Sequence, residues 1–100
     1  MELKYDLNVG ALYIRLADQA VARTREIDDN TVVDIDADGG VIGIEVISIG
    51  HPWALDDVLR DYAIPAAAAA QLRAYFKPAG RVASQEAPAV SLGRNAPVLV

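Results

Sequence analysis

Four acidic residues and a glycine are spaced as in a calcium-binding loop. They are Asp34, Asp36, Asp38, Gly39 and Glu45. In the D-x-D-x-D-G-x5-E pattern of EF-hand loops, oxygen atoms at these positions ligate the ion and the glycine permits a sharp bend. The spacing therefore makes calcium or metal binding one candidate function.

The surrounding residues favour a β-hairpin at the same place. An Asp-Gly pair between alternating apolar residues is a strong hairpin signal, because glycine supplies the positive φ of a tight turn. A turn at Asp38 and Gly39 predicts three facing pairs: Ile35 with Ile42, Val33 with Ile44, and Thr31 with Val46. We therefore expect a solvated acidic face on two strands, whereas an EF-hand loop lies between helices.

The residues needed for most enzymatic chemistry are scarce. His51 is the only histidine and the chain has no cysteine, so a Ser-His-Asp or Cys-His catalytic site would have to include His51. Asp34 and Asp36 would lie about 7 Å apart on a strand face, within the range of hydrolytic carboxylate pairs. Charge pairing with Arg15, Arg23 and Arg25 on the same face is the more ordinary role for these acids. We predict a noncatalytic protein without a cofactor.

Length and composition indicate one small globular domain. The chain has 100 residues, a net charge of −5 and no cysteine, which agrees with a cytoplasmic location. Neither a secretion signal nor an apolar run long enough to cross a membrane is visible. Thirteen of the fourteen acidic residues fall within residues 1–62, so binding of nucleic acid is expected only weakly, through the basic C-terminal segment.

Short alternating segments joined by polar turns predict an α+β fold. Residues 2–49 should form an antiparallel β-meander of four or five strands, because parallel strands would need longer crossover connections. One or two helices, at residues 52–63 and 65–76, should cover one face of the sheet, with a break at Pro65. Residues 1–77 would form this single domain, and residues 78–100 a tail that is flexible or ordered by a partner.

Several segments of the first half resemble a known family. They are Tyr5-Asp6, residues 11–16 (ALYIRL), residues 26–28 (EID), residues 33–39 (VDIDADG) and residues 43–45 (GIE). Over about residues 3–49 the chain resembles the small bacterial domain-of-unknown-function family 2283. Some members look like the smaller partner of a toxin–antitoxin pair, so the resemblance implies an antitoxin-like role.

Exposed apolar residues predict protein binding. A domain of this size buries only ~60% of its unfolded surface and gains stability by association. We expect a homodimer, or a complex with a small toxin-like protein. The interface candidates are Val41, Ile47, Ile49, Leu72, Tyr75 and Phe76.

Overall fold

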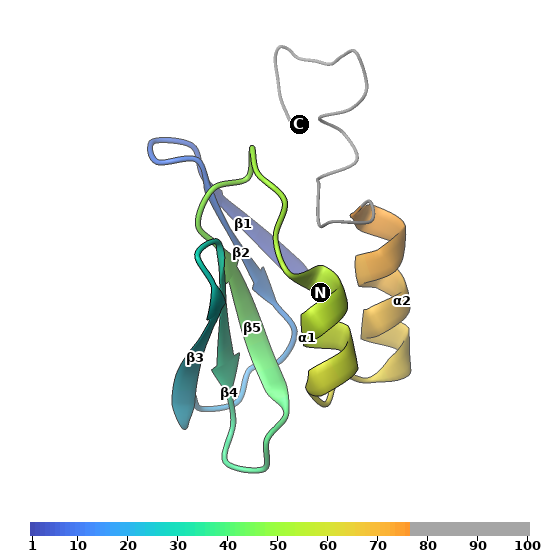
Figure 1. Cartoon of the computed structure of the whole chain (residues 1–100). Helices are drawn as coiled ribbons and strands as arrows, with labels where there is room; N and C mark the ends of the chain where they lie inside the picture. The colour runs from blue at the N-terminus through green and yellow to red at the C-terminus, as the bar shows by residue number, and fades with distance from the viewer. Residues whose placement is uncertain (77–100) are drawn as a thin grey trace.

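Five antiparallel strands form one sheet and two helices follow it in the computed structural model, which describes residues 1–76 (Figure 1). The strands are β1 (Glu2–Asp6), β2 (Ala11–Arg15), β3 (Arg23–Asp28), β4 (Thr31–Ile35) and β5 (Val41–Val46). The helices are α1 (Leu55–Asp61) and α2 (Ala66–Tyr75). The α+β class and the antiparallel sheet are thus confirmed, the meander holds for β3, β4 and β5, and the predicted tail at residues 78–100 lies outside the described residues.

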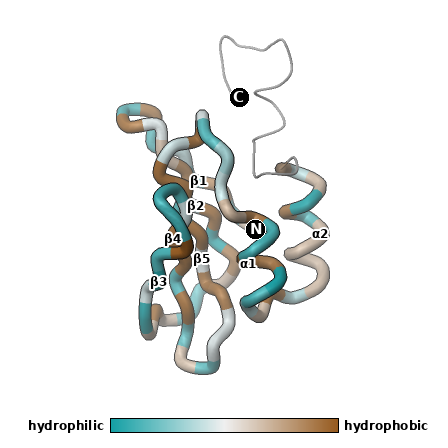
Figure 2. The backbone as a smooth tube through the Cα atoms, viewed as in Figure 1, coloured by the Kyte–Doolittle hydropathy of each residue, from teal (hydrophilic) through white to brown (hydrophobic). Residues whose placement is uncertain are grey.

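The strands do not all pair in chain order. The order across the sheet is β1-β2-β5-β4-β3, so β3, β4 and β5 form a meander while the β1–β2 hairpin joins β5 instead of β3. Burial explains the difference. All residues of β5 except Glu45 are buried, whereas all residues of β3 except Ile27 are exposed. Figure 2 shows the hydrophilic colouring of β3, which suits an edge strand and not a central one.

The β4–β5 hairpin turns where the sequence predicts, but its loop is one residue longer. Gly39 has φ +90°, and the Asp36 amide donates to the Gly40 carbonyl over 2.9 Å, which closes a three-residue loop. Ile35 therefore faces Val41, and the predicted pairing of Ile35 with Ile42 is wrong. A β-bulge then restores the expected register.

Beyond that bulge the predicted register is confirmed. Val33 faces Ile44 and Thr31 faces Val46. The bulge accompanies a contact with the helical segment, since the Val41 amide donates to the Ala63 carbonyl over 3.2 Å. The start of β5 therefore pairs with both β4 and the connection between the helices.

One hydrophobic cluster joins the sheet to the helices. It includes Leu12, Val33 and Ile44 from the sheet, and Val58 and Leu72 from the helices. Figure 1 shows the two helices next to each other beside the sheet. Leu55 and Val58 of α1 and Leu72 of α2 are therefore buried against the same core as the alternating residues of the strands.

The helices are shorter than predicted, but they separate at the expected place. The first helix begins at Leu55 and not at residue 52, because residues 48–54 are held by hydrogen bonds to the side chains of Asn30 and Thr31. Pro65 is the N-cap of α2 with an extended backbone, as expected from its ring and the restriction it places on Ile64. Among residues 1–76, neither helix is long and apolar enough to span a membrane.

Candidate functional site

The carboxylates of the calcium pattern are used by the hairpin itself. Asp34 accepts hydrogen bonds from the Tyr13 hydroxyl (2.8 Å) and the Thr24 hydroxyl (2.7 Å). Asp36 Oδ1 accepts the backbone amides of Asp38 and Gly40, both at 2.9 Å. One acid thus bridges strands and the next closes the turn.

These bonds separate the predicted metal ligands. Asp34 lies on β4, Asp36 and Asp38 belong to the turn, and Glu45 is exposed on β5. Within residues 1–76 no group of three or more acidic or histidine side chains is arranged to hold a metal ion. Strands, and not helices, flank the pattern, so its structural context is that of a hairpin.

The arginines expected beside these acids lie elsewhere. Arg23 pairs with Ile35 and Arg25 with Val33, which places both on the face opposite Asp34. The predicted pairing of these arginines with Asp34 and Asp36 is therefore wrong. Its cause is the β3–β4 register, which sets Thr24 and not an arginine opposite Asp34.

Arg15 does lie on the face of Asp34, but it has other partners. Its Nε is 3.8 Å from the Glu2 carboxylate, and its guanidinium carbon lies 5.7 Å from the centre of the Tyr13 ring. Both contacts are at the β1–β2 side of the sheet. Arg15 therefore contacts Glu2 and the Tyr13 ring, whereas the side chains that donate to Asp34 are the hydroxyl groups of Tyr13 and Thr24.

Tyr13 crosses the sheet over Gly43 to reach Asp34. A Cβ atom at Gly43 would overlap the Tyr13 hydroxyl and ring, so only glycine leaves room for this contact. Burial, followed by the hydrogen bond to Asp34, raises the pKa of Tyr13 to about 12. This tyrosine is thus a neutral hydrogen-bond donor at ordinary pH. Sequence reasoning missed the contact, although a glycine inside a strand signals a close approach of another group.

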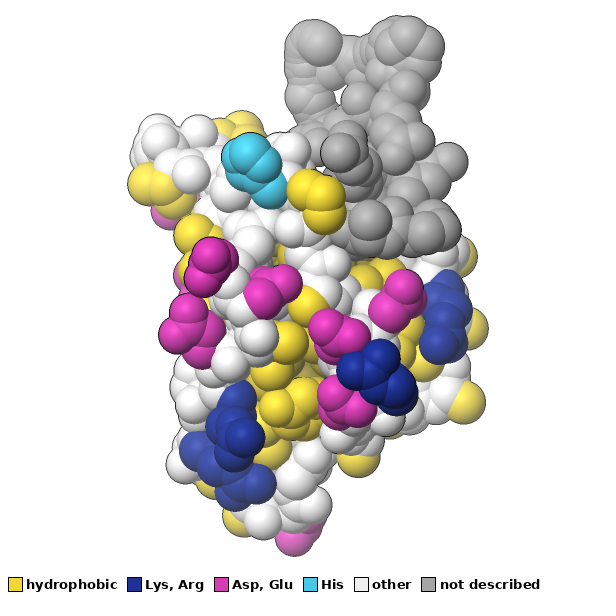
Figure 3. All heavy atoms as spheres, viewed as in Figure 1, with side chains coloured by type: hydrophobic (Ala, Val, Ile, Leu, Met, Phe, Trp, Pro, Cys, Tyr) yellow, Lys and Arg dark blue, Asp and Glu magenta, His cyan; other side chains and the backbone are white. Residues whose placement is uncertain are grey.

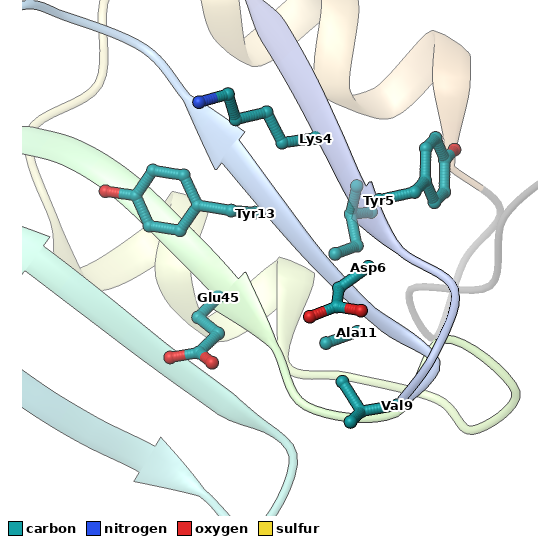
Figure 4. Close-up of a pocket in the computed structure, with 8 residues that line it drawn as sticks. Lys4, Tyr5, Asp6, Val9, Ala11, Tyr13 and Glu45 are labelled. Atoms are coloured by element: carbon teal, nitrogen blue, oxygen red, sulfur yellow. The ribbon is translucent and has the colours of Figure 1, made fainter.

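A shallow hollow opens beside Tyr13 at one end of the sheet (Figure 4). Its volume is about 370 Å³. The lining residues are Lys4, Tyr5, Asp6, Val9, Ala11, Leu12, Tyr13 and Glu45. Lys4, Asp6 and Glu45 are all exposed, so the charged groups of the hollow remain hydrated.

Asn30 is a second residue that the sequence did not single out. Its side chain accepts the Ser48 amide at 2.6 Å and donates to the carbonyls of Ser48 (3.0 Å), Pro52 (3.1 Å) and His51 (3.3 Å). The buried Thr31 hydroxyl next to it accepts the Ala54 amide at 2.8 Å. Together they fix the chain between β5 and α1. The His51 side chain is exposed, and its carbonyl serves in this structural role.

Three of the predicted interface residues are in the core. Val41, Leu72 and Phe76 are at most 5% exposed, so they pack inside the domain and do not offer a surface to a partner. They were expected on unpartnered faces, but the β5 bulge turns Val41 inward and α2 packs Leu72 and Phe76 into the hydrophobic cluster.

The other interface candidates keep some exposure. Ile49 and Tyr75 are half-buried, and the Tyr75 hydroxyl lies 3.0 Å from that of Tyr5. Ile47 is 45% exposed. Leu7 and Val9, at 78% and 69%, are more exposed still and were not predicted.

Three of the five large apolar residues that are exposed within residues 1–76 lie in neighbouring segments at one end of the sheet. Leu7 and Val9 lie in the β1–β2 turn, and Ile47 follows β5. The two segments are joined by a hydrogen bond from the Ile49 amide to the Gly10 carbonyl, 2.8 Å long. We call Leu7, Val9 and Ile47 the apolar tip.

Comparison with known proteins identifies one family. No curated protein and no solved structure matches the chain. The family resemblance seen in the sequence is confirmed, since residues 2–49, the whole sheet and the start of the connection to α1, match the family described as Protein of unknown function (DUF2283).

Proposed function

We propose that this domain is a noncatalytic protein-interaction module that associates with a second copy of itself, with α1 and α2 covering one face of the sheet. The observation that carries the proposal is the apolar tip, where Leu7 and Val9 are 78% and 69% exposed. Burial of apolar surface is the main driving force of association, and a small domain has little core of its own.

The polar groups of the sheet support a noncatalytic role. Asp34 is bonded to the hydroxyl groups of Tyr13 and Thr24, and Asp36 is bonded to backbone amides. A general acid or base needs a free position from which to reach a substrate proton. These carboxylates stabilise the fold instead.

Light scattering after size-exclusion chromatography of the full-length chain tests the proposal. We expect a dimer that dissociates on dilution, and a weaker dimer when Leu7 and Val9 are both replaced by serine. Val21→Ser is the matched control, because Val21 is 50% exposed but lies outside the tip, between β2 and β3. A folded monomer at every concentration would refute self-association.

The antitoxin-like role is a separate part of the proposal. It is supported by the family resemblance and requires a small toxin-like protein as partner. Co-expression of the full-length chain with the product of the neighbouring gene tests it directly. Co-purification that is lost in the Leu7→Ser/Val9→Ser variant would support binding through the tip, and separate elution of the two proteins would exclude this partner.

A further inference from the structure

The two edges of the sheet differ in whether they can accept another strand. Strands β1 and β3 are the outermost strands, and each pairs with only one neighbour. An unpaired edge offers backbone donors and acceptors to a further strand unless charges or irregularities block it. The side chains of each edge therefore determine which of them can bind a second copy.

Charge protects the β3 edge. Two antiparallel copies related by a two-fold axis normal to the sheet must set residues of the same face opposite each other. An axis at a given residue pairs that residue with its own copy and its two chain neighbours with each other. On β3 an axis at Thr24 therefore sets Arg23 opposite the partner's Arg25, and an axis at Arg25 or Glu26 sets that charged residue opposite its own copy. Every one of these registers opposes like charges. A bulge between Glu26 and Asp28 further disrupts this edge, and Figure 3 shows its positive charges gathered over β3.

The β1 edge is self-complementary. An axis at Lys4 is unfavourable, because it opposes Lys4 to its own copy and Glu2 to the partner's Asp6. An axis at Tyr5 instead sets Lys4 opposite the partner's Asp6 twice, and brings Leu3 towards the partner's Leu7, which follows β1 in the turn. An axis at Leu3 gives two pairs of Glu2 with the partner's Lys4.

Two observations favour the axis at Tyr5. Glu2 already has a cation, because its carboxylate lies 3.8 Å from Arg15, whereas Lys4 forms no ion pair within residues 1–76. Leu7 is 78% exposed, and of the two registers with favourable charges only this one brings it to an apolar residue, the partner's Leu3. Opposite charges and apolar pairs directly across an antiparallel ladder both stabilise strand pairing.

We propose that β1 pairs antiparallel with β1 of a second copy, about a two-fold axis at Tyr5, so that the two sheets become one. This inference rests on the proposed self-association and names its surface and register. The apolar tip contributes through Leu7, which directly follows β1. Dimerisation then removes the open edge that would otherwise invite unspecific strand pairing.

Charge exchange in the full-length chain tests the register. Lys4→Glu places an acid opposite the partner's Asp6 in both symmetry-related pairs. We expect the dimer to be at least tenfold weaker, on the order of what the reversal of two charge pairs contributes. Lys4→Glu/Asp6→Lys exchanges the charges and should restore association. Glu2→Lys/Lys4→Glu has the same net charge but leaves an acid at position 4 opposite the partner's Asp6, so the dimer should stay weak.

Asp6→Lys also removes the acceptor of the Asn8 amide in the β1–β2 turn, so this substitution changes the turn as well as the charge. Cross-linking gives a readout that does not depend on Asp6→Lys. The chain has no cysteine, so a single cysteine can form a disulfide only with its own copy. We expect Tyr5→Cys to cross-link efficiently, since paired Cα atoms on the axis lie about 4.5–5.5 Å apart. Lys4→Cys is the control and should not cross-link.

The outcomes separate the two proposals. A wild-type monomer would refute self-association itself. A wild-type dimer that is unaffected by Lys4→Glu and is not cross-linked by Tyr5→Cys would refute the β1 interface while leaving self-association intact. A dimer rescued by Glu2→Lys/Lys4→Glu, or cross-linked by Leu3→Cys, would refute the register at Tyr5.

Discussion

Replacing Asn30 should destabilise the domain although its side chain is only half-buried. Its side chain makes two hydrogen bonds to Ser48 and two weaker ones to His51 and Pro52. A hydrogen bond contributes a net ~0.5–1.5 kcal/mol, and water can replace the exposed bonds, so Asn30→Ala should cost about 2 kcal/mol. For a domain of this size that corresponds to a decrease in Tm of about 8–16 °C.

Thermal unfolding followed by circular dichroism measures this effect. The matched control is Asn8→Ala, because Asn8 lies in an exposed turn and its side chain forms no hydrogen bond within residues 1–76. Amide hydrogen exchange provides a local readout, since the Ser48 amide loses its acceptor in Asn30→Ala. Equal melting temperatures for the two variants, with Ser48 still protected, would refute the idea that Asn30 holds the β5–α1 connection.

Four further predictions concern the sheet, its core and its ligands. Gly43→Ala should cost about 1–3 kcal/mol in urea unfolding because its Cβ would overlap Tyr13, whereas Gly50→Ala, which meets no atom within 4 Å, should be nearly neutral. Folding raises the pKa of Tyr13 from 10.0 to about 12. The stabilisation that its neutral hydroxyl gives to the folded state is therefore complete below pH 10 and is lost as the pH rises to 12. Urea titrations across that range should show a shallower loss of stability in Tyr13→Phe. Leu72→Ala should cost about 2–5 kcal/mol because Leu72 is fully buried, and its exposed neighbour Gln71→Ala should change stability little. Millimolar calcium should leave the Tm of the wild-type chain unchanged, since the acids of the calcium pattern are not gathered around a site within residues 1–76; an increase would restore the metal-binding hypothesis.

Local patterns determined the elements of the fold. The Asp38-Gly39 signal predicted the hairpin because positive φ at Gly39 is a property of the backbone alone. Alternating apolar residues predicted that Val33 and Ile44 face each other and that both are buried. Pro65 likewise separated the two helices through its own ring. Each of these features depends on residues close together in the chain.

The candidate site was predicted only in part. The sequence drew attention to Asp34 and Asp36, but it suggested an ion or arginines as their partners. The actual partners of Asp34 are Tyr13, 21 residues away, and Thr24, 10 residues away. Gly43 inside β5 signals that another group approaches closely, but no local spacing records which strand will supply that group.

The tertiary structure decided the order of the strands and the surface that remains. Strand β5 lies between β2 and β4, and its apolar residues are buried there. The charged strand β3 is left at the edge of the sheet. The bulge at Ile42 occurs where the start of β5 also pairs with Ala63, a residue more than 20 positions further along the chain. Packing against the helices removed Val41, Leu72 and Phe76 from the surface and left Leu7, Val9 and Ile47 exposed. Sequence thus determined the elements through local backbone chemistry, whereas competition between segments for the same buried area decided their arrangement.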